Sequence, residues 1–443
     1  MSFIITNTAW AENFLDIQDE ETLTSGAMTI FANGVCLTRN VSRRTNSLRD
    51  EVILSAYPIA LWMSSSWWRL LYESLPSNEI MTPQWRMSHE LAAAGSGYAW
   101  PRITFISDGN GINIFSHPKS EQDTIAEPLF YTGAKDQRVI FSDFENAIDA
   151  FISQAILHIE RHNQKQSELA AVWEELQTER HDPEQRWYRI IEAKLGFEPD
   201  DAPQKFMQDI VKKLKKFDDS VILELATLCN MDEEKNIDER LEAIVDMSRK
   251  GIQGKWTLTD FSSGSNNIEL PPWEYGRLIA RNLRQYLGKM LKKIDSSTLY
   301  DILGLSKEKI KNFIPHNATF SISSCTDKDM KINIKKESSY FYTVGLRFQL
   351  ARLIGAYLSA EPNEQWLPVT PCKTWKQKVQ RAFATEFLSP ISEVREMVGG
   401  IPTEQSIRKA AKHFLVSPQT ILHGLANHGD IAKDDLLRFA FQH

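Results

Sequence analysis

The sequence is poor in cysteine and carries no large excess of charge of either sign. Its four cysteines, among 443 residues, are far apart and form no C-x-x-C pair. That spacing favours reduced thiols in a cytosolic protein over a disulfide framework or a zinc ribbon. A net charge of −7 and a pI near 5.9 give no global electrostatic reason to expect nucleic acid or an anionic membrane as partner. Because Met1–Phe14 has no basic start, we expect no signal peptide and a cytoplasmic protein.

Long apolar runs are also scarce, and only Val52–Tyr72, VILSAYPIALWMSSSWWRLLY, raises the question of a membrane. A spanning helix needs about 20 predominantly apolar residues with few polar breaks. Here Pro58, Ser64–Ser66 and Arg69 interrupt the run. We therefore expect a buried, Trp-rich core helix and no membrane partner.

The length and the mixed patterns predict an α+β protein, mostly helical, with two or three domains. We expect an N-terminal α+β domain over residues 1–141 and a helical middle region over 142–260. A C-terminal domain with a small sheet and a closing helical hairpin is expected over 272–443. The stretch Phe261–Pro272, FSSGSNNIELPP, is small, polar and then proline-rich, which is typical of a linker.

Two turn motifs predict β-hairpins in the N-terminal domain. Asn33-Gly34 lies within Ala27–Asn40, between β-rich runs, and SDGNG divides Ile103–Phe115. A helix is expected over Gln84–Ala94. Within it, His89-Glu90 suggests a zinc motif, but alanine stands where the second histidine would fall, so we interpret the pair as helix surface.

Tryptophan is abundant in and just after the N-terminal domain, with seven of the chain's 12. Such residues form either a packed core or interface, or a platform on which bases or another aromatic ligand stack. The seven are Trp10, Trp62, Trp67, Trp68, Trp85, Trp100 and Trp173.

One dense basic run lies in the middle region, in the sequence VKKLKKFDD. Leu214 and Phe217 interleave with the lysines, so one face of the expected helix is apolar and the other cationic. The cationic face is either solvated or a contact for nucleic acid. The run consists of Lys212, Lys213, Lys215 and Lys216.

The segment Leu346–Tyr357, LRFQLARLIGAY, has the frame of a zinc-protease helix without its metal ligands. It resembles the R-F-x-L-A-H-E-x-G-H pattern of the ImmA/IrrE metallopeptidase family. In that register Arg352 replaces the first histidine, Leu353 the catalytic glutamate and Ala356 the second histidine. The matching positions are Arg347, Phe348, Leu350, Ala351 and Gly355.

A second motif agrees in register, since QKVQRAFATEFLSP, Gln377–Pro390, resembles the family's E-x-x-A-N-x-F-A-x-x-L-L-x-P helix. Gln377 stands where the family has its third zinc ligand. A guanidinium has no lone pair, alanine has no donor, leucine has no base, and one amide oxygen is a poor zinc ligand. The resemblance therefore implies a zincin-like fold with no metal, no cofactor and no catalytic residue.

The resemblance covers about residues 272–431. It includes an expected lead-in helix over Trp273–Gly288 and expected strands at Ala318–Ser323 and Met330–Lys335. A helical pair over 403–429 resembles a helix-turn-helix. Its second helix, PQTILHGLANH, has no lysine or arginine, so we expect it to pack against the core and not to read DNA.

These observations favour a non-catalytic pseudo-peptidase that binds a protein partner in regulation. The family adds the expectation of antiphage defence or mobile-element control. Two alternatives stay open. One is a hydrolase or nuclease with its activity in the N-terminal domain, although that domain has no G-x-S-x-G elbow and no phosphate-binding glycine loop. The other is a nucleic-acid-binding regulator that uses the tryptophans and the lysine run.

Overall fold

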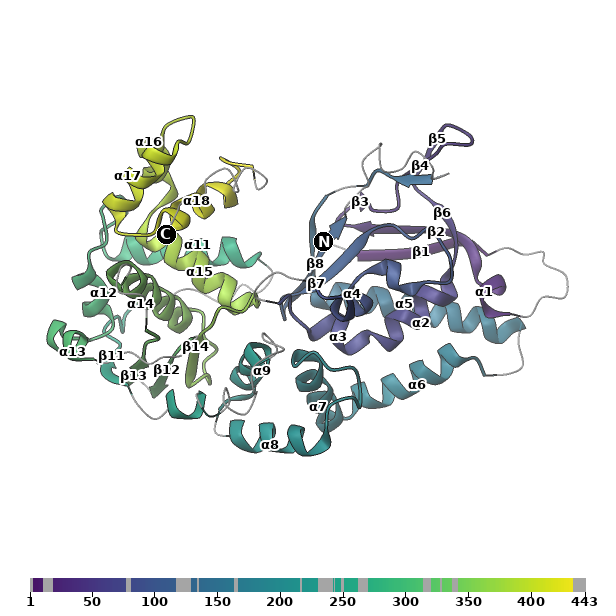
Figure 1. The fold of residues 1–443 in the computed structure, drawn as a ribbon, viewed down its shortest axis with the longest axis horizontal. Coiled ribbons are helices and arrows are strands. Elements are labelled where there is room, and N and C mark those ends of the chain that lie inside the picture. Colours follow the sequence, from purple (N-terminus) through teal and green to yellow (C-terminus); the bar gives the residue numbers. More distant parts are fainter. Residues whose placement is uncertain are drawn as a thin grey trace. The chain divides into compact units, whose positions relative to one another are not determined.

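The computed structural model describes the chain in two compact units, residues 1–208 and 209–443 (Figure 1). The expected helical middle region is thereby divided. Helices α5 (Phe141–His162), α6 (Glu168–His181) and α7 (Pro183–Lys194) lie in the first unit, and α9 (Asp219–Cys229) lies in the second. Helix α8 (Gln204–Leu214) begins in one and ends in the other. The described residues are 3–10, 19–76, 81–116, 129–133, 135–162, 166–215, 217–229, 242, 244–247, 251–261, 270–313, 320–326, 329–336 and 342–432.

Three small antiparallel sheets form in the first unit. The first has the order β1-β2-β3, with β6 paired to β2; the others run β10-β8-β7 and β5-β4-β9. The strands are β1 (Phe3–Trp10), β2 (Ser25–Ala32), β3 (Val35–Cys36), β4 (Asn40–Ser42), β5 (Ser47–Arg49), β6 (Val52–Ser55), β7 (Ile103–Ser107), β8 (Gly111–Ser116), β9 (Leu129–Tyr131) and β10 (Gln137–Ile140).

Both expected hairpins are confirmed. Strand β2 pairs with β3 across Asn33 and Gly34, whose φ angles of 49° and 79° are those of the two central residues of a type I′ turn. Strand β7 pairs with β8 across the second turn, where the Asp108 carboxylate accepts bonds from the backbone N–H groups of Asn110 and Gly111. Local turn chemistry is thus enough to set both registers.

The single helix expected over Val52–Tyr72 is wrong in its first part. Residues 52–55 form β6, which pairs with β2, because the β-branched Val52 and Ile53 suit a strand. Ser55 then caps α2 (Ala56–Ser65) by accepting a bond from the Tyr57 backbone, and α3 (Trp67–Tyr72) follows after Ser66. No helix among the described residues is long and apolar enough to span a bilayer.

The core interpretation of the tryptophans is confirmed for Trp62, Trp67, Trp68, Trp85 and Trp100, all of which are buried. The long helix α5 packs against β1 and β8 and completes this core. The remaining short helices of the first unit are α1 (Glu20–Leu23), α4 (Pro83–His89) and the 3₁₀ turn η1 (Leu91–Ala94).

The second unit contains one four-stranded antiparallel sheet of order β11-β13-β12-β14. Two of its strands were expected, β12 (Ser321–Thr326) and β13 (Asp329–Asn333). The other two are β11 (Ile252–Lys255), from a region expected to be helical, and β14 (Trp366–Val369). Lys255 and Thr257 extend this attachment by donating backbone bonds to the carbonyls of Leu303 and Ile302. Residues 252–257 are thereby tied into the C-terminal domain.

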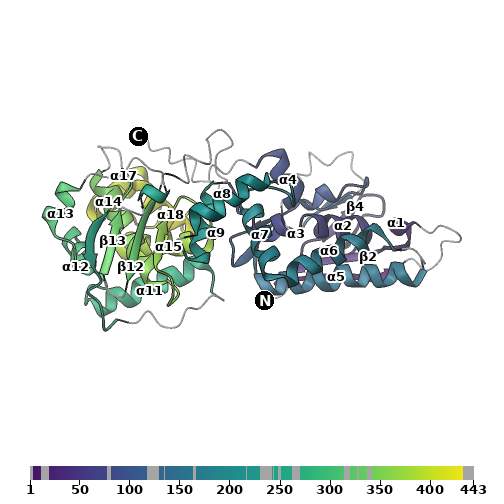
Figure 2. The ribbon, with the colours of Figure 1, turned by 90° about the horizontal axis from the view of Figure 1, so that it is seen from below.

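Helices α14 (Tyr342–Leu358) and α15 (Trp375–Leu388) lie on one face of this sheet and pack on each other (Figures 1 and 2). Helix α11 (Pro272–Tyr286) forms where the lead-in helix was expected, and it packs along α15. The closing pair is confirmed as α17 (Glu404–Phe414) and α18 (Pro418–Asn427), with Ser417 capping α18. The other helices are α12 (Ser296–Ile302), α13 (Lys307–Asn312) and α16 (Ile391–Val398).

Candidate functional site

Helix α14 places the degenerate positions on two of its faces. Leu346, Leu350 and Ile354 recur every four residues and are buried in the core of the second unit. Arg352 and Ala356, also four residues apart, share a different face of the same helix. In the family pattern this second face is the one that carries the two histidines.

Glycine sets the separation between α14 and α15. A Cβ atom at Gly355 would lie 2.8 Å from the Phe383 ring, so only glycine allows this approach. Helix α15 starts at the N-cap Thr374, whose hydroxyl accepts a bond from the backbone of Gln377. Gln377 therefore lies in the first turn of α15, opposite α14.

The structure brings Arg352 and Gln377 into direct contact. The Arg352 Nη2 donates to Gln377 Oε1 at 2.5 Å, to the Thr370 carbonyl at 2.8 Å, and to Gln380 Oε1 at 3.4 Å. Its Nε is buried and has no partner. The positions of the first and third ligands in the family register thus converge, and a guanidinium fills the space between them.

Gln377 is an amide for a structural reason. Its Oε1 also accepts from the Thr370 backbone N–H at 2.9 Å, while its Nε2 donates to the Pro368 carbonyl at 2.9 Å. Gln380 Nε2 donates to the same carbonyl at 3.1 Å. A carboxylate at Gln377 has no hydrogen to give Pro368, so glutamine satisfies this buried set better than the ligand it replaces.

The other two degenerate positions are buried and have no polar side-chain atom. Leu353 is fully buried and belongs to the hydrophobic core. Ala356 is buried and lines a small pocket together with Gln377. Neither position can bind a metal or accept a proton.

Burial holds the pKa of the Arg352 guanidinium well below its usual range, and nearby Arg381 lowers it further. Burial also lowers the pKa of Arg381, which donates to the Cys372 carbonyl at 2.7 Å. Glu224 of α9 acts in the opposite sense, and its carboxylate accepts from the Thr370 hydroxyl at 2.9 Å. Because like charges repel most strongly away from water, two buried guanidiniums disfavour a metal ion here.

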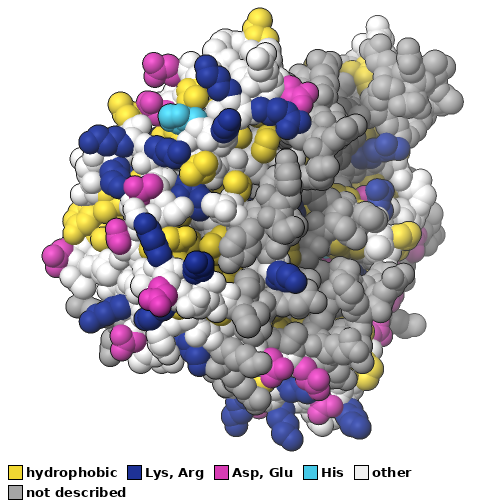
Figure 3. All heavy atoms as spheres, turned by 60° about the vertical axis from the view of Figure 1, so that its left-hand side comes forward, with side chains coloured by type: hydrophobic (Ala, Val, Ile, Leu, Met, Phe, Trp, Pro, Cys, Tyr) yellow, Lys and Arg dark blue, Asp and Glu magenta, His cyan; other side chains and the backbone are white. Residues whose placement is uncertain are grey.

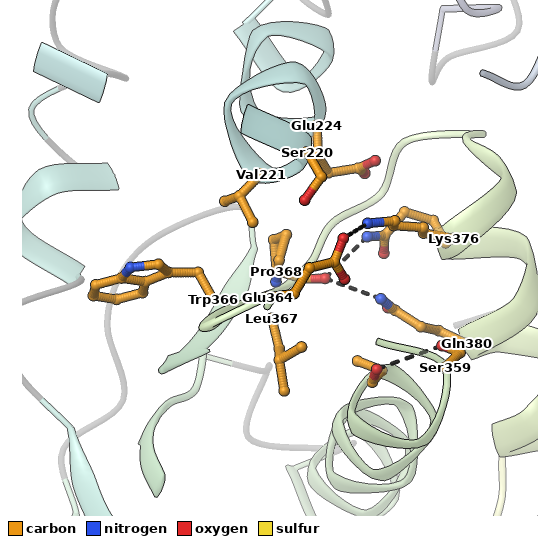
Figure 4. A pocket seen from close by; sticks show the side chains of 12 residues that line it. Ser220, Val221, Glu224, Ser359, Glu364, Trp366, Leu367, Pro368, Lys376 and Gln380 are labelled. Atoms are coloured by element: carbon orange, nitrogen blue, oxygen red, sulfur yellow. Dashed lines mark hydrogen bonds and ion pairs between the residues drawn. The ribbon is translucent and has the colours of Figure 1, made fainter. Parts of the chain in front are cut away.

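The pocket beside these residues has a volume of only about 20 Å³, room for roughly one water molecule. Figure 4 shows Glu364 and Lys376 joined as an ion pair on one side of it, with Ser359, the residue after α14, and Gln380 of α15 also lining it. It is too small for a peptide side chain of any substrate.

Helix α9 and the residue before it cover the free edge of the sheet. Strand β14 is the last strand, and the Asp218 carboxylate accepts from the backbone N–H groups of Gln365 at 2.7 Å and Trp366 at 3.3 Å. The Phe217 and Trp366 rings meet edge to face at 4.9 Å. The edge where an extended peptide could add as a further strand is therefore occupied by the chain itself. No sequence pattern marked Asp218 or Glu224, because their partners lie about 150 residues away.

The basic run has the amphipathic form expected of it. Leu214 and Phe217 are buried, whereas Lys212 and Lys215 are exposed and Lys213 is half-buried. Lys216 lies outside the described residues. Lys212 and Lys215, the exposed lysines that the structure describes here, form no hydrogen bond or ion pair with the four degenerate positions.

The surface position expected for His89 is wrong. Its side chain is fully buried, stacks on Trp85 at 4.0 Å between ring centroids, and contacts the Phe105 carbonyl at 3.1 Å and Glu73 Oε2 at 3.0 Å. The carbonyl only accepts, so Nδ1 carries a proton. Arg69, also buried, donates to the same Glu73 oxygen at 2.7 Å. Sequence spacing missed this cluster because its members come from three separate elements.

Among the residues described, no group of three or more His, Cys, Asp or Glu side chains is arranged to hold a metal ion. Comparison of the chain with protein-family models, with curated proteins and with solved structures gives no match.

Proposed function

We propose that the second unit is a non-catalytic, ImmA/IrrE-like pseudo-peptidase domain, and that the protein acts by binding a protein partner. The observation that carries the proposal is the contact between Arg352 and Gln377 at 2.5 Å. Two motifs that resemble one family, 25 positions apart in the chain, converge in space at the positions where that family holds zinc.

The chemistry of the site supports a binding role. Hydrolysis of a peptide by this kind of site needs a polarised water and a base to take its proton. Here the positions for both are a guanidinium, a leucine and an alanine, and the sheet edge beside them is covered by residues 217–224. What remains is a folded domain that can act through its surface. We propose regulation in antiphage defence or mobile-element control as its setting, an expectation that comes from the family resemblance.

Metal analysis of the purified full chain tests the proposal. Wild-type protein, purified without chelator and equilibrated with zinc, is expected to hold no stoichiometric zinc after desalting. One zinc per chain that disappears on Gln377→Ala would overturn it. A matched control is Gln349→Ala, a buried glutamine of α14 that bonds to Ser321 and lies outside the degenerate positions.

A further inference from the structure

Exposed apolar side chains gather on one segment of the second unit. Of the eleven large hydrophobic residues that are exposed among those described, five lie between positions 273 and 291, in α11 and the loop after it. Leu291 is 62% exposed and Tyr286 49% exposed. Clusters of this kind mark interaction surfaces, whereas single exposed hydrophobics do not. The five are Trp273, Leu278, Tyr286, Met290 and Leu291.

Lysines surround the tip of this surface. Lys289, Lys292 and Lys293 flank Met290 and Leu291 in the loop. Residues 270–432 contain 23 Lys and Arg against 14 Asp and Glu, whereas residues 1–208 contain 17 against 29. The whole-chain charge of −7 therefore hides a basic C-terminal domain. Figure 3 shows the face on the left-hand side of Figure 1, where Lys and Arg side chains are interspersed with hydrophobic ones.

Two buried arginines fix the loop in place. Arg284 donates to the carbonyls of Met290 at 3.0 Å, Lys292 and Phe387, and burial lowers its pKa to about 10. Arg347 donates to the Ile294 carbonyl at 2.7 Å and to the carbonyls that end α17. No carboxylate of the described residues bonds to either guanidinium.

This arrangement points to an anionic partner. Buried charges are normally paired, but these two guanidiniums bond only to carbonyls and one hydroxyl. Glu386 and Glu393 act on Arg284, and Asp295 acts on Arg347, only through longer-range attraction. The charge of the two arginines therefore adds to that of the three lysines in the loop, of which Lys289 also lies near Asp295. Arg347 also bonds to the carbonyls of Phe414, the last residue of α17, and Leu415, its C-cap, and so joins the loop to the end of that helix.

We propose that α11 and the loop to Lys293 form the partner-binding surface, and that the partner is a protein segment with large apolar side chains flanked by Asp or Glu. The inference rests on the proposed function, because it says where a pseudo-peptidase with a closed cleft binds. Tyr286, Met290 and Leu291 supply the apolar centre, and the lysines supply a basic rim. Duplex DNA is disfavoured because its interfaces are more polar than this one. A membrane is disfavoured because Glu274 and Gln285 lie among the exposed apolar residues of α11.

A library of random peptides displayed on phage, selected against the full chain, tests this surface. Enriched peptides are expected to combine acidic with large apolar residues. Synthetic copies should bind Leu291→Asp, and the pair Lys292→Glu with Lys293→Glu, at least roughly tenfold more weakly than wild type. Matched controls are Leu48→Asp, at a leucine that is 63% exposed, and Lys212→Glu with Lys215→Glu. The controls should bind like wild type.

Three results would overturn the proposal that this surface binds the partner. They are a selection that enriches no peptide, enriched peptides without acidic residues, and peptides that bind the loop variants as tightly as wild type. Tighter binding of duplex DNA or of phosphatidylserine vesicles, lost in the same variants, would assign the surface to that ligand instead. Self-association in sedimentation that the loop variants abolish would assign it to a second copy. Zinc analysis of the same preparations distinguishes the two proposals. If the protein holds no zinc and the loop variants do not change peptide affinity, the proposed surface is wrong but the pseudo-peptidase proposal is not.

Discussion

Each unit buries an arginine among polar partners, but the two arginines are neutralised in different ways. In the first unit Arg69 bonds to the carboxylates of Glu73 and Glu198, and Glu73 also contacts His89. In the second unit Arg352 bonds only to amide and carbonyl oxygens, and its Nε is unpaired. The first cluster balances its own charges. The second is a cation tolerated where the family resemblance places a metal.

The two clusters should therefore respond differently to mutation. Removing one member of a balanced buried cluster leaves an uncompensated charge, which is costly. Removing a buried cation that bonds to no carboxylate relieves the cost of its desolvation, which offsets the hydrogen bonds lost.

The largest effect is expected from Glu73→Ala. It leaves Arg69 and His89 buried without their shared carboxylate, so the free energy of unfolding should fall by about 3–5 kcal/mol. Urea unfolding followed by tryptophan fluorescence reports it, because Trp85 stacks on His89. The control Glu90→Ala removes the partner of the exposed Arg86 and should cost at most about 1 kcal/mol. Equal losses of stability for the two variants would show that the buried carboxylate contributes no more than the exposed one.

The next effect concerns the contact of α14 with α15 that holds Arg352 against Gln377. Gly355→Ala places a methyl group 2.8 Å from the Phe383 ring, and the overpacking should cost about 1–3 kcal/mol. Gly400→Ala is the control, since nothing lies within 4 Å of a Cβ there. Thermal unfolding that is unchanged by Gly355→Ala would mean that the two helices are not held this closely.

Acid should reduce the stability that the Arg69–Glu73–His89 cluster contributes and should not change that of the Arg352 cluster. Burial opposes the ionisation of Glu73, but the bonds and charges of His89 and Arg69 outweigh it and hold the pKa of this carboxyl below 4.5. A depressed folded-state pKa stabilises the protein above the unfolded value, and this contribution is lost as pH falls below about 4.5. Each pH unit that separates the folded-state pKa from the unfolded-state pKa contributes about 1.4 kcal/mol. The free energy of unfolding of wild type and of Glu73→Gln, measured between pH 6 and pH 3, tests this. Wild type should lose more stability than the variant as the pH falls. Roughly parallel curves for the two proteins would contradict the prediction.

The smallest effect is expected from Arg352→Met. The side chain keeps much of the volume and loses the charge, so stability should stay within about 1 kcal/mol of wild type. A loss as large as that of Glu73→Ala would contradict the comparison. It would mean that the guanidinium is as tightly compensated as Arg69.

Local patterns predicted much of this fold. The Asn33-Gly34 hairpin and the helix expected at Leu346–Tyr357 each depend on residues close in sequence, and both are observed. The family resemblance assigned Arg352 and Gln377 to the first and third ligand positions of one site, and their side chains are in contact. Neither motif alone contains that contact, because each lies on its own helix.

Long-range partners account for what the sequence did not predict. Strand β11 forms because β13, more than 70 residues later, offers it an edge. His89 is buried because Glu73 and Phe105 arrive from other elements to bond both of its ring nitrogens. The sequence around Ile252–Lys255 and around Ser88–Glu90 contains no pattern that predicts these partners.

The central claim is that residues suited to a structural role now stand where a metal site of this shape has its ligands. The most direct measurement is a calorimetric zinc titration of wild type beside a variant that restores the family's ligand set. The variant carries Arg352→His, Leu353→Glu, Ala356→His and Gln377→Glu. We expect the restored protein to bind one zinc ion per chain and wild type to bind none. Stoichiometric zinc in wild type, or none in a restored protein that circular dichroism shows to be folded, would contradict it.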